Sequence, residues 1–244
     1  MGFGPINSGS NPDRAIGDFL EPILEKKKLQ DIYNIIADSW TNLRSKPKDF
    51  IVEISKKING NNILDLGCGN CSGMIPFLER KMMCVGLDYS KSMIREAKKL
   101  LDRKKVRGYL TIGDVINLPF KNSTFDVVLY IAAFHHIPTR KLRLISLEEI
   151  KRTTPIKCNV YIAVWNRMQF KFVLKLFISL FKKKYEFGDI FQPWNYHGKT
   201  FKRFYHLYTK HELETDIETA GFKINKIDVG KGYNRRNIFM EVSK

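Results

Sequence analysis

The sequence predicts an α/β fold of the Rossmann-like kind, with a mostly parallel seven-stranded sheet, helices on both faces and an antiparallel C-terminal hairpin. Short apolar runs alternate with amphipathic helical patterns through the middle of the chain, which is typical of parallel strands joined by crossover helices. The last two apolar runs follow each other without a helix between them, so we expect them to pair antiparallel. A length of 244 residues suits one large domain of this class.

The N-terminal part is interpreted as two segments. Residues 1–29 are polar and then lysine-rich, and we expect a loose arm there, or a short helix from Ala15. From residue 30, apolar side chains recur at helical spacing as far as Trp40, and Pro47 opens a second helix that Gly60 ends. We therefore predict an arm over residues 1–29 and a single domain over residues 30–244.

The remaining elements follow from the same patterns. Strands are expected at 63–66, 83–87, 109–112, 125–132 and 160–165, and helices at 73–80, 91–103 and 139–152. A last helix over 210–220 precedes two strands, 223–229 and 237–242, which the turn-prone stretch 230–234 joins.

Residues 168–208 break the alternation and form a basic, aromatic insertion. The section 171–210 has nine lysines or arginines against two acidic residues, a net charge of +7. Two interpretations remain open. One is a helix with a solvated basic face followed by a loop. The other is an insertion that grips a nucleic acid, with cations on phosphates and aromatic rings on unstacked bases.

Charge and cysteine content narrow the functional class. The chain has 42 Lys+Arg against 25 Asp+Glu, a net charge of +17, which favours a polyanionic partner, nucleic acid first and an anionic membrane surface second. No apolar stretch is long enough to span a bilayer. Cys68 and Cys71 have the Cys-x-x-Cys spacing but lack the second half of a zinc site, so we expect no metal, free thiols and a cytoplasmic location.

The stretch 63–70, Ile-Leu-Asp-Leu-Gly-Cys-Gly-Asn, is a strand that runs straight into a glycine turn. Gly67 and Gly69 remove the Cβ atom where a backbone must turn sharply and approach a ligand closely. No third glycine completes the dinucleotide fingerprint. Asp65 suits an ammonium group rather than a phosphate, and Asp88, at the end of the second strand, can hold both hydroxyls of a ribose.

These features resemble the class I S-adenosylmethionine-dependent methyltransferases, whose first motif is Asp-Leu-Gly-Cys-Gly. The resemblance implies S-adenosyl-L-methionine as cofactor, with its methionine portion at Asp65, its ribose at Asp88 and its adenine at Asp114. The full set of cofactor-binding residues that it implies is Asp65, Gly67, Cys68, Gly69, Asp88, Tyr89, Asp114, Val115 and Ile131.

Three further stretches look like the tRNA wobble-uridine carboxymethyl methyltransferases, which esterify 5-carboxymethyluridine in the anticodon loop. They are 31–37 with 44–47, 117–126 with 131–140, and 203–213 with 220–222. The likeness covers about residues 30–244. It implies the tRNA anticodon loop as substrate. It also implies a small zinc-binding activator protein that pairs along one sheet edge, near Met82, Met83 and Tyr109.

The substrate hypothesis follows from the chemistry of a carboxylate. A carboxylate is already ionised at neutral pH, so it needs no general base to attack a sulfonium methyl group. We expect Arg44 and His135 to hold it, and Arg44, His135 and Asp88 are the candidate catalytic residues. Other interpretations remain open, since Arg44 can cap its helix and Tyr205 can belong to the core. The candidate substrate-binding residues are Tyr33, Arg44, His135, Arg203, Tyr205 and His206.

Two rival functions remain open at this point. One is a small-molecule or lipid-precursor methyltransferase at a membrane surface, with residues 170–184 as a basic amphipathic helix among the headgroups. The other is a subunit that binds the cofactor and stabilises another protein without catalysis. The three acidic residues Asp65, Asp88 and Asp114 argue against the second, because a non-catalytic subunit has no need of them.

Overall fold

The computed structural model describes residues 12–58, 60, 62–180, 186–230 and 237–244. For residues 12–19, 170, 173 and 178–180 it describes the backbone only. Our expectations for residues 1–11, for the lysines at 182–184 and for the turn at 231–234 lie outside the described residues.

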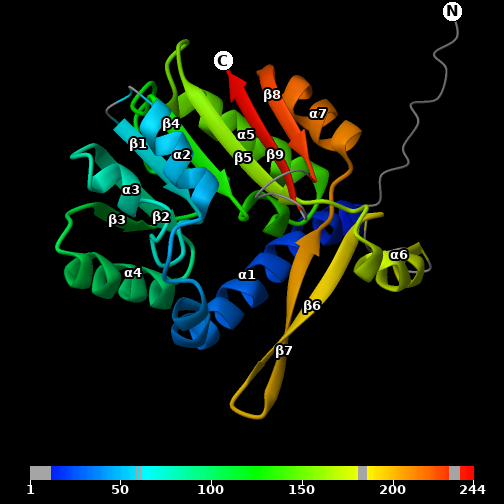
Figure 1. Cartoon of the computed structure of the whole chain (residues 1–244). Helices are drawn as coiled ribbons and strands as arrows, with labels where there is room; N and C mark the ends of the chain where they lie inside the picture. The colour runs from blue at the N-terminus through cyan, green and yellow to red at the C-terminus, as the bar shows by residue number, and fades with distance from the viewer. Residues whose placement is uncertain (1–11, 59, 61, 181–185, 231–236) are drawn as a thin grey trace, which may run out of the picture.

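The fold is built on a seven-stranded sheet of order β3-β2-β1-β4-β5-β9-β8 (Figure 1). Its strands are β1 (Asn62–Leu66), β2 (Met83–Asp88), β3 (Tyr109–Ile112), β4 (Val127–Ile131), β5 (Asn159–Trp165), β8 (Lys223–Val229) and β9 (Asn237–Ser243). The first five run parallel, and β9 is antiparallel to both β5 and β8. The predicted fold class is therefore confirmed.

Helices cover both faces of the sheet because successive strand residues point to opposite sides. Leu64 and Leu66 of β1 lie in an apolar cluster with α5 (Arg140–Thr153) and α7 (Lys210–Thr219). Ile63 lies in a second cluster, with α2 (Asp49–Lys57), α3 (Ile75–Leu78) and α4 (Lys91–Lys104). The β1 side chains are buried on both faces of the sheet, which explains why the parallel strands appear in the sequence as continuous apolar runs.

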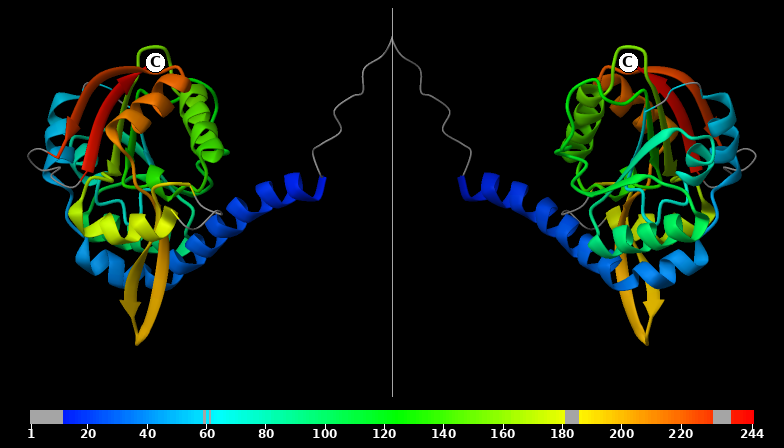
Figure 2. Two further views of the ribbon diagram at one scale, coloured as in Figure 1. Left: turned by 90° about the vertical axis from the view of Figure 1, so that its right-hand side faces the viewer. Right: turned by 90° about the vertical axis from the view of Figure 1, so that its left-hand side faces the viewer.

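Helix α1 (Pro12–Leu43) continues without a break past residue 29, where we expected the arm to end. Of the two alternatives that we left open for the described part of this segment, the loose arm was wrong, and the helix is present but is long rather than short. One face of α1 is held on the end of the sheet: Gln30 Nε2 donates to the Tyr89 carbonyl at 2.6 Å, and Asn34 Oδ1 accepts from Ser90 Oγ at 2.8 Å. The N-terminal half of the helix extends away from the body of the protein (Figure 2).

The insertion contains more regular structure than we expected. A short 3-10 helix η2 (Phe170–Phe172) and α6 (Val173–Leu180) precede two antiparallel strands, β6 (Asp189–Tyr196) and β7 (Lys199–His206). The predicted loop was therefore wrong, because these strands form a hairpin that projects from the body (Figure 1). Its two-residue turn has positive φ at both His197 and Gly198, which suits the twist of a hairpin.

The hairpin is fixed to α1 by two side-chain hydrogen bonds. Trp194 Nε1 donates to Ser39 Oγ at 3.1 Å, and the Tyr196 hydroxyl donates to Asp38 at 2.7 Å. The hairpin and α1 thus form one wall beside the carboxyl ends of the parallel strands. Of the described helices, none combines the length and apolar character that crossing a membrane requires.

Candidate functional site

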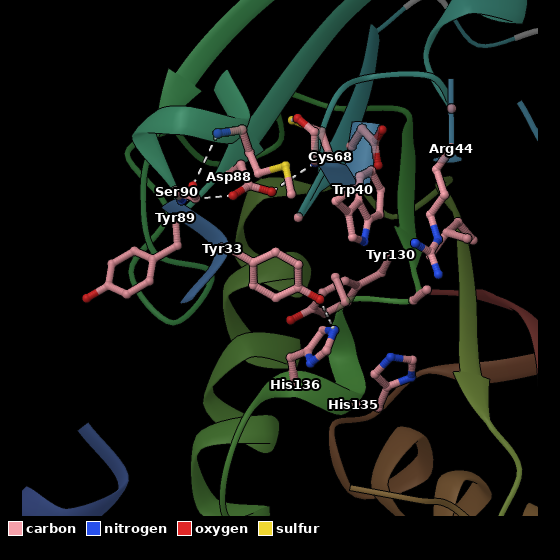
Figure 3. A pocket seen from close by; sticks show the side chains of 18 of the residues that line it. Tyr33, Trp40, Arg44, Cys68, Asp88, Tyr89, Ser90, Tyr130, His135 and His136 are labelled. Atoms are coloured by element: carbon pink, nitrogen blue, oxygen red, sulfur yellow. Dashed lines mark hydrogen bonds between the residues drawn. The ribbon is translucent and has the colours of Figure 1, made fainter. Parts of the chain in front are cut away.

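A cavity of about 650 Å³ lies at the carboxyl ends of the parallel strands, between them, α1 and the hairpin (Figure 3). Its size is typical of a small-molecule site. Residues from widely separated parts of the chain meet in it. Of our candidates, those that line it are Tyr33, Arg44, Asp65, Gly67, Cys68, Gly69, Asp88, Tyr89, Asp114, Val115, Ile131, His135, Arg203 and Tyr205.

The loop after β1 can turn into the cavity because of Gly67. Its φ is +65°, and a Cβ placed there would lie 2.4 Å from the Cβ of Ala133. Any other residue would therefore be strained in its backbone and would collide with the segment that follows β4. The loop leaves a cradle of bare backbone on the cavity wall.

Asp88 ties that loop to the end of β2. Its Oδ2 accepts from the Gly69 N–H at 2.9 Å and its Oδ1 from the Ser90 N–H at 2.8 Å. Burial raises the pKa of Asp88 to about 6, although these backbone hydrogen bonds oppose the rise. The carboxylate is held rigidly, and its remaining lone pairs are available to hydroxyl donors.

Asp65 lies on β1, two residues before the loop, and is 6% exposed. Burial and the nearby charge of Asp88 raise the pKa of Asp65 to about 8. The group is therefore mostly neutral at pH 7 while no cation is beside it. A positively charged ligand group next to it would favour ionisation and would in turn be held by the carboxylate.

Two adjacent histidines on the 3-10 helix η1 (Phe134–His136) point into the far half of the cavity (Figure 3). His135 Nδ1 lies 3.1 Å from the Trp165 N–H, so Nδ1 must accept. Burial lowers the pKa of His135 well below its usual value, which keeps the ring neutral. The ring hydrogen is therefore on Nε2, and that buried atom has no hydrogen-bond partner among the described residues.

His136 has the opposite tautomer. Its Nδ1 lies 2.8 Å from the Phe204 carbonyl, which can only accept, and its Nε2 lies 3.0 Å from the Tyr33 hydroxyl. Burial lowers the pKa of His136 to about 3. The neutral ring thus accepts the Tyr33 hydroxyl hydrogen and fixes the direction of that hydroxyl. The sequence analysis left His136 out of the site.

Two arginines and a tryptophan form the mouth of this half. The guanidinium groups of Arg44 and Arg203 lie 5.3 and 4.7 Å from the ring centre of Trp194, within the range of a cation–π contact. Neither arginine has an ion-pair partner among the described residues, and the buried Arg203 Nε has no hydrogen-bond partner there. Tyr205 stacks on Trp165 at 4.3 Å. The mouth is therefore cationic and aromatic.

His206 does not belong to the cavity, and its prediction as a substrate-binding residue is corrected. It is fully buried, with Nδ1 2.6 Å from Asp189 and Nε2 2.8 Å from Glu212. Each ring nitrogen therefore faces a carboxylate and not the cavity. Glu186, Asp189 and His206 could in geometry surround a cation, but Arg143 already lies 2.6 Å from Glu186. The cluster joins β6 and β7 to α7.

The sequence analysis missed residues on α1. Lys26 and Gln30 line the cavity together with Tyr33, and these three positions share one helical face. The helical spacing of these positions is present in the sequence. We began the helix only at residue 30, because the lysine-rich stretch before it was interpreted as part of an arm. Trp40 also lines the cavity, and the Arg44 guanidinium lies over its ring, 5.1 Å from the ring centre.

Comparisons with known proteins identify the family of the chain. Residues 63–154 match the family model described as methyltransferase domain. A protein of Encephalitozoon cuniculi named as a methyltransferase, without a stated substrate, is 31% identical over 171 residues, 66% of this chain and 70% of the relative. A tRNA (carboxymethyluridine(34)-5-O)-methyltransferase of Schizosaccharomyces pombe is 25% identical over 237 residues, 90% of this chain and 97% of the relative.

Solved structures agree in fold. The crystal structure of an S-adenosylmethionine-dependent methyltransferase from Methanosarcina mazei superposes with a TM-score of 0.69 at 19% identity, over 79% of this chain and 96% of that one. At this identity the likeness supports only the fold, and the shared fold is the methyltransferase fold with the parallel strands that end at the cavity.

Proposed function

The chain belongs to the class I S-adenosylmethionine-dependent methyltransferases, and from this premise we propose that it methylates the carboxylate of 5-carboxymethyluridine at the wobble position of tRNA. One observation carries the proposal: the half of the cavity beyond the glycine loop is lined by His135 and Arg203, whose buried His135 Nε2 and Arg203 Nε donors have no hydrogen-bond partner among the described residues. Unpaired buried donors are rare unless a ligand completes them.

S-adenosyl-L-methionine is the cofactor, and the residues at the glycine loop suit it. We place its ammonium group at Asp65, because a buried carboxyl with a raised pKa gains most from a cation. The bare backbone at Gly67 allows close approach of the methionine portion. Asp88 suits the ribose hydroxyls and Asp114 the adenine amine. When bound, the cofactor supplies an electrophilic methyl group on a sulfonium.

Cofactor affinity is expected to depend on pH through Asp65. In the empty site the pKa of Asp65 is about 8, so below pH 8 binding an ammonium group must release the carboxyl proton. Affinity should therefore rise as pH rises from 6 to 8, by up to about tenfold per unit, since one proton is released. Titration calorimetry with S-adenosylhomocysteine checks this. The Asp65→Asn variant should bind weakly with a flat profile. A flat profile in the wild type would contradict the placement.

The acceptor half suits a carboxylate nucleophile. His135 offers an N–H without a positive charge, because burial keeps its ring neutral. It can therefore hold one carboxylate oxygen without quenching the charge of the other, while Arg203 and Arg44 add cationic attraction. The other carboxylate oxygen would then be free to act as the nucleophile toward the methyl group that bound S-adenosylmethionine would supply, with the bonding pair left on sulfur. No proton moves in this step, so the residues act by positioning.

A tRNA substrate is supported by the charge and shape around the cavity mouth. The hairpin adds the exposed Lys199 on the same strand face as Arg203, and cations with aromatic rings are the usual surface for single-stranded RNA. The S. pombe relative, named for the same wobble nucleoside, aligns over 97% of its length.

A transfer assay tests the substrate class. Labelled methyl groups should pass from S-adenosylmethionine to tRNA and be released by mild alkali, as esters are. Rates should fall steeply with salt, because phosphate contacts release counterions. Label in phospholipid vesicles or in small acids, with none in tRNA, would overturn the proposal.

We also propose a strand-pairing partner at β3, the zinc-binding activator that the sequence resemblance implies. β3 ends the sheet, and Tyr109 and Ile112 on it are 67% and 47% exposed, with Met83 of β2 at 41%. An open edge with exposed apolar side chains invites a partner strand.

This partner proposal predicts the behaviour of Tyr109→Glu. The variant should stay monodisperse without the activator, whereas the wild type alone should aggregate or bind cofactor weakly. It should also lose stimulation by the activator. Ile156→Glu is the control, because Ile156 is 77% exposed away from this edge. Size-exclusion chromatography and activity titration measure both. Stimulation of Tyr109→Glu equal to that of the control would contradict the proposed edge.

A further inference from the structure

Lys26 reaches from α1 to the carboxylate of Asp114, the residue just beyond the end of β3. Its Nζ lies 2.6 Å from Oδ1 and 2.5 Å from Oδ2. The lysine is 8% exposed, and its side chain is more deeply buried than that of Asp114, which is 27% exposed. The two residues are 88 positions apart in the sequence, and both line the cavity.

The surrounding contacts make this corner rigid. Four residues along α1, Gln30 Nε2 donates to the Tyr89 carbonyl at 2.6 Å, and Lys26 Nζ itself lies 5.6 Å from the Tyr89 ring centre. On the other side, Asp114 Oδ1 accepts from the Ile116 N–H at 3.2 Å. The carboxylate is thus oriented from both sides.

Counting acceptor sites shows what the pair leaves open. An ionised carboxylate has about four lone-pair sites. Lys26 uses one on each oxygen and Ile116 uses the second on Oδ1, so the described residues leave one site on Oδ2. A single donor, such as an amine hydrogen of adenine, can occupy that site without expelling the lysine.

Sharing is favoured over displacement because an unpaired buried charge is costly. An adenine that expelled Lys26 would leave the buried ammonium without its carboxylate, and the neutral amine cannot replace the charge of the lysine beside Asp114. Lys26 therefore remains in place when adenine binds.

We propose that Lys26 is a positioning residue for the cofactor, which holds Asp114 so that one carboxylate lone pair faces the adenine amine. The inference rests on the placement of adenine at Asp114 given above, and it does not depend on the methyl acceptor. It assigns the lysine-rich part of α1 a role in adenosine recognition.

Titration calorimetry with S-adenosylhomocysteine tests the proposal without turnover. Lys26→Met should weaken binding about tenfold, because the carboxylate is then free to rotate and to hydrate. Lys26→Arg should stay within about threefold of the wild type, since it keeps a cation at the site. Lys28→Met is the matched control, because the Lys28 side chain is 70% exposed, and it should bind like the wild type. Equal or tighter binding by Lys26→Met would overturn the proposal and make the lysine a competitor of adenine.

A double-mutant cycle separates this inference from the adenine placement. Asp114→Asn alone should also weaken binding about tenfold, and Lys26→Met/Asp114→Asn should be little weaker than either single variant, because the residues act as a unit. Losses that multiply to about a hundredfold would overturn the positioning role while keeping adenine at Asp114. No loss in Asp114→Asn would overturn both.

Discussion

Replacing His135 by alanine is expected to lower kcat/KM for methyl transfer to tRNA by about 10²–10³-fold. The loss equals that of one preorganised donor in a dry site. His135 Nε2 is such a donor: it is buried, it carries the ring hydrogen because Trp165 N–H occupies Nδ1, and no described residue accepts from it. Affinity for S-adenosylhomocysteine should change little, because the cofactor residues lie on the other side of the cavity.

Two further variants make this expectation specific. His135→Gln carries an amide N–H near the position of Nε2 and should recover a substantial part of the lost rate. His211→Ala removes an exposed histidine of α7 and should be without effect. Thermal unfolding checks that each variant is folded. A folded His135→Ala enzyme with the wild-type rate would remove His135 from the site.

Replacing His206 by alanine is expected to lower the free energy of unfolding by about 3–5 kcal/mol, because it breaks a buried network of polar side chains and leaves the buried Asp189 without the ring that it contacts. Asp189 and Glu212 each lose their partner on the ring, and Glu212 keeps Arg167. Urea unfolding measures the change. The variant His211→Ala, at an exposed position of α7, should change stability by less than about 0.5 kcal/mol. A similarly small change for His206→Ala would contradict the network.

The sheet could be predicted from the sequence because strands and helices are marked by patterns among neighbouring residues. Each parallel strand is a short apolar run between helical patterns, and β3 and β8 begin and end where the runs do. That Gly67 and Asp88 would lie together could also be predicted, because a glycine turn directly after one strand and an acidic residue at the end of the next strand meet at the same edge of a parallel sheet, and both line the cavity. Their role toward the cofactor stays a prediction.

The rest depended on contacts between distant segments. Lys26 looked like part of a solvated lysine run, and only its packing on Asp114 makes it part of the cavity. His206 stood in the most family-like block of the chain and was assigned to substrate, whereas the direction of its side chain follows from the register of β6 against β7. Strand parity places Arg203 and Tyr205 on the face toward the cavity and His206 on the other.

The central claim, that this cavity esterifies a wobble carboxymethyl group, is tested most directly by nucleoside mass spectrometry. The protein is incubated with S-adenosylmethionine and tRNA carrying 5-carboxymethyluridine, with and without a zinc-binding activator, and the digested nucleosides are weighed. We expect the methyl ester of 5-carboxymethyluridine, formed with the activator and lost in His135→Ala. Unchanged 5-carboxymethyluridine in every reaction, in a protein that binds the cofactor, would contradict the claim and direct the search to a small-molecule acceptor.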